Sequence, residues 1–240
     1  GKTLTILGKI KYLIEERHIP KEEIICLTFT NMAVESLKKK IKREINDEIE
    51  CYTFHKLAMK ILDETNYNYE IADDELLTIV VENFFNIDIL SSPYLLKIVL
   101  RYFNIYFSKD YYKRYQKLLI TKNKEILLLK RQIITFIHLF KCGNYKLEDY
   151  QKFFKKIKSY LLPITYLKEK YFLLLVLNIY LLYEKEKKES RELDFDDLLF
   201  IARDRIKYYK RKISYIIIDE YQDTSYVRFL FIKELVDKFN

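Results

Sequence analysis

Two carboxylates follow a strongly apolar segment near the end of the chain. Residues 213–218 read Ile-Ser-Tyr-Ile-Ile-Ile, which is typical of a buried parallel strand. Asp219 and Glu220 come directly after it, with Gln222 close behind. Open α/β sheets bind ligands at the carboxyl ends of their strands. We therefore expect Asp219 to hold Mg²⁺, Glu220 to orient and deprotonate an attacking water, and Gln222 to link this site to neighbouring loops.

The chain begins with Gly1-Lys2-Thr3 ahead of an amphipathic helix, as at the end of a phosphate-binding loop. We expect Gly1, Lys2 and Thr3 to bind a nucleotide together with Asp219 and Glu220. Lys2 would neutralise phosphate charge. The predicted catalytic residues are therefore Lys2, Glu220 and Gln222. The Thr3 hydroxyl would share the metal with Asp219. Taken alone, Gly1-Lys2-Thr3 could be a chance tripeptide, and Asp219-Glu220 could be a solvated turn. The pattern Asp-Glu-Tyr-Gln-Asp-Thr is more particular, because a turn needs neither its glutamine nor its second aspartate.

Composition limits the class of protein. A chain of 240 residues has room for one large or two small domains, and its 3 Gly and 3 Pro favour helices over long loops. The longest uncharged apolar stretch, residues 171–183, is shorter than the roughly 18 residues of a membrane span. The widely spaced Cys26, Cys51 and Cys142 favour reduced thiols in a cytoplasmic protein. The net charge of +8 permits nucleic-acid binding, although AT-biased coding would also explain it.

Strand and helix patterns alternate at the start of the chain, which implies parallel βαβ units. Helices are predicted over residues 2–17, 32–45 and 54–62, and strands over 23–28 and 49–53. From about Asp73 to about Arg191 nearly every segment reads as helix, and the α/β pattern returns at 194–199. We predict an α/β fold, a parallel sheet interrupted by a large all-helical insertion, with segments 1–70, 71–191 and 192–240.

Other polar groups have structural interpretations. Asp194, Asp196 and Asp197 could suggest a metal cluster, but a helix cap by Asp194 or Asp196 explains them better. His18 and His138 have no companion ligands. The basic run Lys38–Arg43 is expected to be a solvated helix face, with phosphate tracking as a secondary role.

Several motifs, in order, resemble those of the UvrD/Rep-type superfamily 1 DNA helicases. Gly1-Lys2-Thr3 resembles the end of the first nucleotide motif, residues 27–33 the second motif, and Thr53-Phe54-His55 the third. Residues 193–199 are similar to the segment before the metal motif, and 218–224 to the metal motif itself. The motifs span the chain but make up a minority of it, and the helical middle matches only loosely.

The resemblance implies an ATP- and Mg²⁺-dependent 3′–5′ translocase on single-stranded DNA, acting in repair, replication or recombination. Its fold would be a P-loop NTPase (RecA-like) domain 1A, interrupted by the helical subdomain 1B. The second RecA-like domain, with its arginine fingers, is expected beyond Asn240, and the adenine-reading segment before Gly1. Expected partners are single-stranded DNA, single/double-strand junctions and that second domain, but no membrane.

The resemblance also implies a DNA site. Phe29 would stack on a base, Thr30 and Asn31 would hold phosphate or sugar, and His55 would contact the backbone. Thr28 and Thr53 complete the predicted set. Single-strand binding without sequence preference uses aromatic platforms and phosphate contacts. The alternatives are core packing for Phe29 and a local backbone hydrogen bond for His55.

Other functions compete with a free-standing helicase. The chain could belong to the motor subunit of a helicase–nuclease or phage-defence complex, or to a non-catalytic DNA-binding module. A non-catalytic module with a decayed motor is disfavoured, because the predicted nucleotide-site residues are intact: Lys2, Thr3, Asp219, Glu220 and Gln222. An unrelated P-loop ATPase does not explain residues 28–33 and 53–55. The isolated fragment is expected to fold, to bind nucleotide weakly or not at all, and to lack DNA-stimulated ATPase activity.

Overall fold

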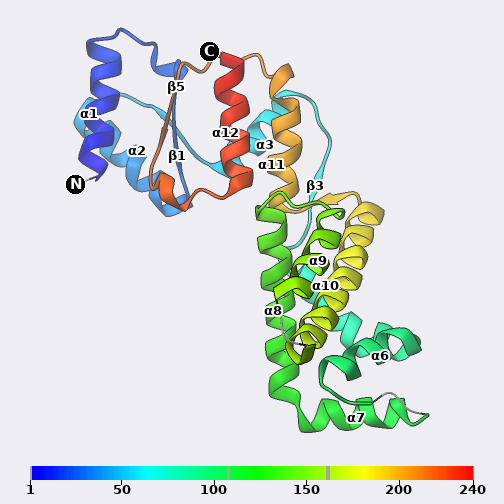
Figure 1. Cartoon of the computed structure of the whole chain (residues 1–240). Coiled ribbons are helices and arrows are strands. Elements are labelled where there is room, and N and C mark those ends of the chain that lie inside the picture. Colours follow the sequence, from blue (N-terminus) through cyan, green and yellow to red (C-terminus); the bar gives the residue numbers. More distant parts are fainter. Residues whose placement is uncertain (1, 107–108, 161–162, 240) are drawn as a thin grey trace. The chain divides into compact units, whose positions relative to one another are not determined.

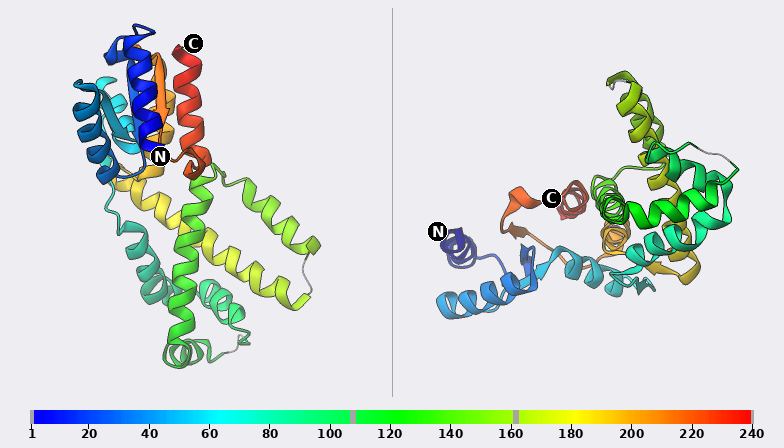
Figure 2. Two further views of the ribbon diagram at one scale, coloured as in Figure 1. Left: turned by 90° about the vertical axis from the view of Figure 1, so that its left-hand side faces the viewer. Right: turned by 90° about the horizontal axis from the view of Figure 1, so that it is seen from below.

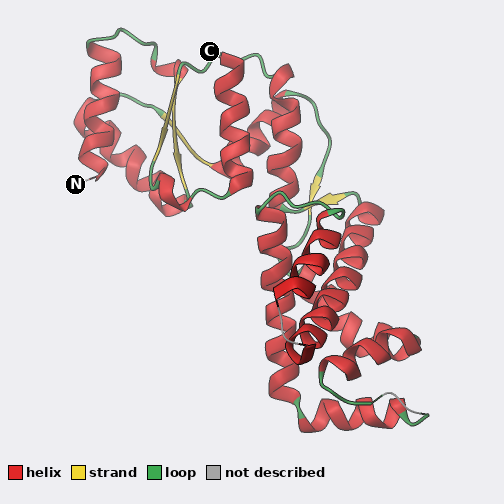
Figure 3. Cartoon of the chain, viewed as in Figure 1, coloured by secondary structure: helices red, strands yellow, loops and turns green. Residues whose placement is uncertain are grey.

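The computed structural model describes residues 2–106, 109–160 and 163–239, without the side chains of Lys2 and of residues 157–165. Gly1 therefore lies outside the described residues. The chain forms two compact units, Gly1–Tyr69 with Leu193–Asn240 as unit 1 and Glu70–Glu192 as unit 2. Helices predominate, and a small parallel sheet lies in unit 1 (Figure 3). Among the described residues, no helix combines the length and apolar character needed to cross a bilayer.

The sheet of unit 1 has the order β2-β1-β5, with β1 (Ile24–Thr28) between β2 (Glu50–Thr53) and β5 (Tyr215–Ile218). Both pairings are parallel, and Cys26 lies opposite Cys51 on one side and Ile217 on the other. Every residue of β1 is buried, as its apolar run Ile24–Leu27 predicts. Because all the strands run the same way, their carboxyl ends meet at one edge of the sheet.

Helices cover both faces of this sheet (Figure 1, Figure 2). Ile24 and Cys26 share a core with helices α1 (Lys2–Glu15) and α2 (Asn31–Ile45). Ile25 and Leu27 face the opposite core, which is built by α3 (Phe54–Glu64), α11 (Phe195–Arg205) and α12 (Tyr226–Phe239). This alternation follows from the two-residue period of a strand. Each aliphatic side chain so buried contributes about 1.5–3 kcal/mol to folding.

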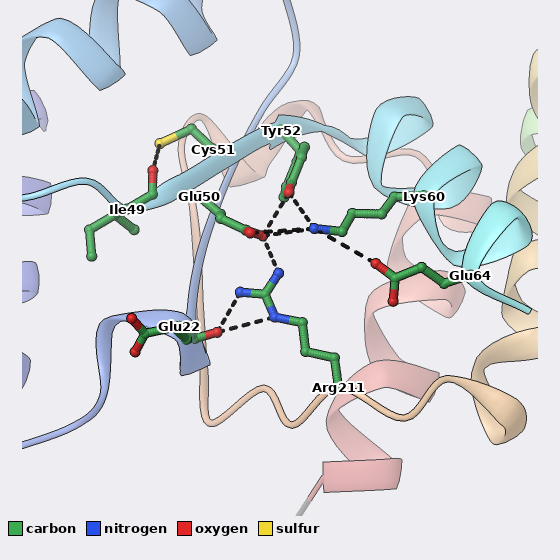
Figure 4. A network of polar contacts seen from close by, with 8 residues as sticks. All are labelled: Glu22, Ile49, Glu50, Cys51, Tyr52, Lys60, Glu64 and Arg211. Carbon is green, nitrogen blue, oxygen red and sulfur yellow. Dashed lines mark hydrogen bonds and ion pairs between the residues drawn. The ribbon is translucent and has the colours of Figure 1, made fainter.

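A polar network joins the amino ends of the three strands (Figure 4). The Arg211 guanidinium, in the loop before β5, donates to the Glu22 carbonyl before β1 and to the Glu50 carboxylate at the start of β2. Glu50 also accepts from the Tyr52 hydroxyl at 2.6 Å and from the Lys60 ammonium at 3.2 Å. These bonds fix three segments that are distant in sequence, at the edge opposite the strands' carboxyl ends.

Unit 2 is helical and has its own apolar core. Its longest helices are α8 (Asn123–Cys142) and α10 (Pro163–Ser190). The other helices are α4 (Leu76–Asn83), η2 (Phe84–Asp88), α5 (Ile89–Ser91), α6 (Pro93–Tyr102), α7 (Tyr111–Thr121) and α9 (Asp149–Tyr160). The buried Tyr115 hydroxyl donates to the Phe85 carbonyl at 2.6 Å. Between α4 and α5 the chain passes through a π-turn, η2.

Short elements complete the fold. Strands β3 (Glu70–Ile71) and β4 (Glu192–Leu193) pair with each other, and η1 (Lys21–Glu23), η3 (Ile206–Tyr208) and η4 (Tyr221–Asp223) are single turns. The predicted aspartate cap is confirmed: Asp194 accepts a hydrogen bond from the Asp197 N–H at 2.9 Å and forms a capping box at the start of α11. Cys26 and Cys51 are buried and unlinked.

Candidate nucleotide and DNA site

The carboxylates of the predicted metal motif lie where β5 ends. The Asp219 N–H donates a hydrogen bond to the Leu27 carbonyl of β1 at 2.9 Å. The hydrogen bonding between β5 and β1 therefore extends to Asp219. Glu220 then turns the chain, with φ 51° and ψ 45° in the left-handed region. A non-glycine residue in that region costs about 1–3 kcal/mol, and such strain is concentrated at functional sites. The Gln222 amide donates to the Glu220 carboxylate, which brings these two predicted catalytic side chains together.

A hollow of about 350 Å³ lies between this strand end and α1. Asp219 and Glu220 line it directly after β5, and Thr5 and Lys9 line it from α1. Thr3 lies on the same helix, half-buried. The structure thus places α1, which begins at Lys2, beside these carboxylates, with Thr5 and Lys9 as its polar residues at the hollow. Lys9 was not predicted, because nothing in its sequence context distinguishes it from a solvated lysine.

The donor set at this hollow suits a nucleotide-bound Mg²⁺. Carboxylate and hydroxyl oxygens are the ligands Mg²⁺ prefers, and in nucleotide sites one or two carboxylates suffice because phosphates supply other ligands. Within the described residues, no cluster of three or more His, Cys, Asp or Glu side chains could hold a metal alone. Lys9 adds positive charge at the rim, which favours a phosphate ligand over a bare cation.

The predicted DNA residues follow β1 and β2, the neighbouring strands. Thr28 is 1% exposed, and its hydroxyl donates to the Thr30 carbonyl at 3.1 Å. The Thr30 hydroxyl caps α2 by accepting from the Ala33 N–H, and exposed Asn31 is the first residue of that helix. Thr53 caps α3 in the same way and is 8% exposed. Thr28 and Thr53 therefore shape the two loops from inside, whereas Thr30 and Asn31 face solvent.

The two predicted aromatic contacts are half-buried. The Phe29 ring lies 5.3 Å from the ring of Phe54, so part of it packs against the core. The His55 ring lies 5.0 Å from the ring of Phe195, which is 40% exposed. Burial, and secondarily the charge of Arg228, lower the pKa of His55 to about 4. His55 is therefore neutral at physiological pH, and it can donate a hydrogen bond but brings no charge.

Arg228 is a member of this cluster that sequence reasoning missed. It lies in the first turn of α12, and its guanidinium carbon is 5.2 Å from the centroid of Phe29 and 5.7 Å from that of Phe54. One signal was available in the sequence. A cation in the first turn of a helix opposes the helix dipole, so an arginine shortly after Thr224 was unusual.

Comparison with known proteins agrees with this arrangement. The family model described as UvrD/REP helicase N-terminal domain matches residues 1–240. The protein named ATP-dependent DNA helicase PcrA from Bacillus subtilis (strain 168) is 26% identical over 255 residues, covering 100% of this chain and 28% of that protein. The proteins of the same name from Staphylococcus epidermidis (strain ATCC 12228) and Staphylococcus aureus (strain COL) are each 26% identical, over 249 and 251 residues, with the same coverage.

The chain therefore spans 28% of the length of these relatives and corresponds to their N-terminal part. Its match to the family model extends over its whole length. The chain belongs to the UvrD/REP helicase N-terminal domain family.

Proposed function

We propose that this chain is the ATP-binding N-terminal part of an ATP-dependent DNA helicase. In this proposal unit 1 is a P-loop, RecA-like domain 1A, and unit 2 is its helical insertion, subdomain 1B. One observation carries the proposal. The predicted nucleotide carboxylates and both predicted DNA loops follow the carboxyl ends of three adjacent parallel strands, β5, β1 and β2, and so share one edge of one sheet.

The nucleotide half would work through Lys2, Thr3, Asp219, Glu220 and Gln222. Bound ATP and Mg²⁺ would supply the phosphoanhydride whose hydrolysis drives movement. Lys2 would neutralise phosphate charge, and Thr3 and Asp219 would offer oxygen ligands to the metal. Glu220 would take the proton of the attacking water. The hydrogen bond from Gln222 holds the Glu220 carboxylate in one orientation, which supports that role.

The DNA half would bind the strand without reading its sequence. Phe29 is half-buried, and the exposed part of its ring can contact a base, as aromatic platforms do in single-strand binding. Thr30, Asn31 and His55 lie at or beside the N-termini of α2 and α3, where backbone N–H groups and the helix dipoles favour phosphate. Directional 3′–5′ movement would require the second RecA-like domain and its arginine fingers.

The proposal is tested by Phe29→Ala in the full-length protein. We expect single-stranded DNA affinity to fall by about 1–3 kcal/mol for all sequences alike. Fluorescence anisotropy with a labelled oligothymidylate measures this, and DNA-stimulated ATP hydrolysis should weaken in parallel. Tyr208→Ala is a suitable control, because Tyr208 is 54% exposed on η3, away from these loops in the sequence. Unchanged affinity in the folded Phe29 variant would assign Phe29 to the core.

A further inference from the structure

Arg228 is unusual among the half-buried arginines of unit 1. Arg205 donates to the Thr65 carbonyl at 2.5 Å, and Arg211 donates to the Glu50 carboxylate. No ion pair joins Arg228 to a carboxylate within the residues that the structure describes. Its guanidinium instead lies over the rings of Phe29 and Phe54, at 5.2 and 5.7 Å. Its positive charge is therefore held close to an aromatic pair without a negative partner.

The surroundings of Arg228 make the lack of a partner more significant. Arg228 lies in the first turn of α12, next to the positive end of that helix dipole. Phe29 immediately precedes the Thr30 cap of α2, and Phe54 is the first residue of α3. Arg228 thus lies where the N-termini of three helices approach one another. The Arg228 charge and the three helix N-termini all make the electrostatic potential here positive. His55 beside them is neutral, because burial and the Arg228 charge lower its pKa.

We propose that Arg228 binds a backbone phosphate of single-stranded DNA, next to the base that stacks on Phe29. The inference rests on the proposed function and adds a phosphate-binding residue to it. A guanidinium can stack on an aromatic face while its N–H groups, in the plane of the group, point toward a phosphate. The phosphate supplies the negative charge that the cluster lacks. Neutral His55 can donate a hydrogen bond to the adjoining sugar or phosphate.

The test compares Arg228→Gln and Arg228→Lys with the parent in the full-length protein. Binding of a labelled oligothymidylate is measured by anisotropy across a range of salt concentrations. For single strands, each phosphate contact contributes about 0.7 to the slope of log K against log salt. We expect Arg228→Gln to reduce the slope by about 0.7 and the affinity about tenfold. Arg228→Lys should keep the slope, because it keeps the charge.

Arg203→Gln is the matched control. Arg203 also lies over an aromatic ring, that of Phe200 at 5.8 Å, but it is paired with Asp204. Its loss should leave the slope at the parent's value. A folded Arg228→Gln variant with the parent's slope would overturn the inference. If Phe29→Ala still weakened binding in that case, the proposed function would stand. Failure of the parent itself to bind single-stranded DNA would instead overturn the proposed function.

Discussion

Replacing Arg211 with alanine should destabilise unit 1 from the edge opposite the functional loops. The Arg211 side chain is 19% exposed and its partner Glu50 is 38% exposed, so the pair lies between surface and core. An exposed pair contributes about 0–1 kcal/mol, and breaking a buried pair costs about 3–5 kcal/mol. Glu50 keeps its bonds from Tyr52 and Lys60, so it is not left uncompensated. We expect a loss of about 1.5–3 kcal/mol, including the bonds to the Glu22 carbonyl.

The assay must report on unit 1 alone, because the chain has two compact units. Amide hydrogen exchange, followed by mass spectrometry on peptides that contain β1, gives the opening free energy of the central strand. Lys210→Ala is the control, since Lys210 is the preceding residue and is exposed. It should leave exchange at the parent's rate. Equal exchange in the Arg211 variant and the parent would refute the idea that this network stabilises the sheet.

The same network predicts a pH dependence. Burial acts to raise the pKa of Glu50, but hydrogen bonds from Tyr52 and Arg211 outweigh it, and the net pKa lies below its ordinary value of 4.5. A carboxyl group with a lowered folded pKa stabilises the fold above its unfolded pKa, and this contribution is lost as pH falls through the folded value. The difference between parent and Arg211→Ala should therefore be largest near neutrality and shrink below about pH 4.5.

Three further predictions concern other parts of the chain. In the full-length protein, Glu220→Gln should retain ATP·Mg²⁺ binding and lose about 10²–10⁴-fold in turnover; parent-like steady-state ATPase would exclude the general-base role. Asp194→Ala should cost about 0.5–2 kcal/mol by removing the α11 cap, seen as faster exchange in α11, and unchanged exchange would mean that the cap is dispensable. Tyr115→Phe should destabilise unit 2 by about 1 kcal/mol, whereas parent-like exchange in α7 would show that its buried hydrogen bond contributes nothing.

Local sequence patterns were sufficient for the long elements and for the strand ends. The uninterrupted apolar run of β1 and the apolar period of α2 reflect burial that repeats along each element, so both could be predicted. The sequence pattern changes near residues 70 and 191, and the compact units change after Tyr69 and Glu192. The order of the strands, with β1 in the centre, depends on long-range pairing that no local pattern encodes.

What the sequence did not predict depends on contacts between distant segments. Arg228 lies 199 positions after Phe29, and only the packing of α12 against the first loops brings them together. Lys9 and Asp219 line one hollow only because α1 packs beside β5. The π-turn at Phe84–Asp88 arises where Phe84 and Phe85 are both fully buried, which the three-to-four-residue period of an α-helix does not reveal.

The outer edge of β5 has a consequence for the behaviour of this chain in solution. Within the described residues β5 pairs only with β1, and all four of its residues are half-buried, in contrast to the fully buried β1. Three of these residues are consecutive isoleucines, Ile216–Ile218. A strand edge that lacks a second paired strand is a template for pairing with another copy. Concentrated solutions of the 240-residue chain should therefore self-associate edge to edge, and salt, which screens charge but not apolar contact, should not dissolve the aggregates.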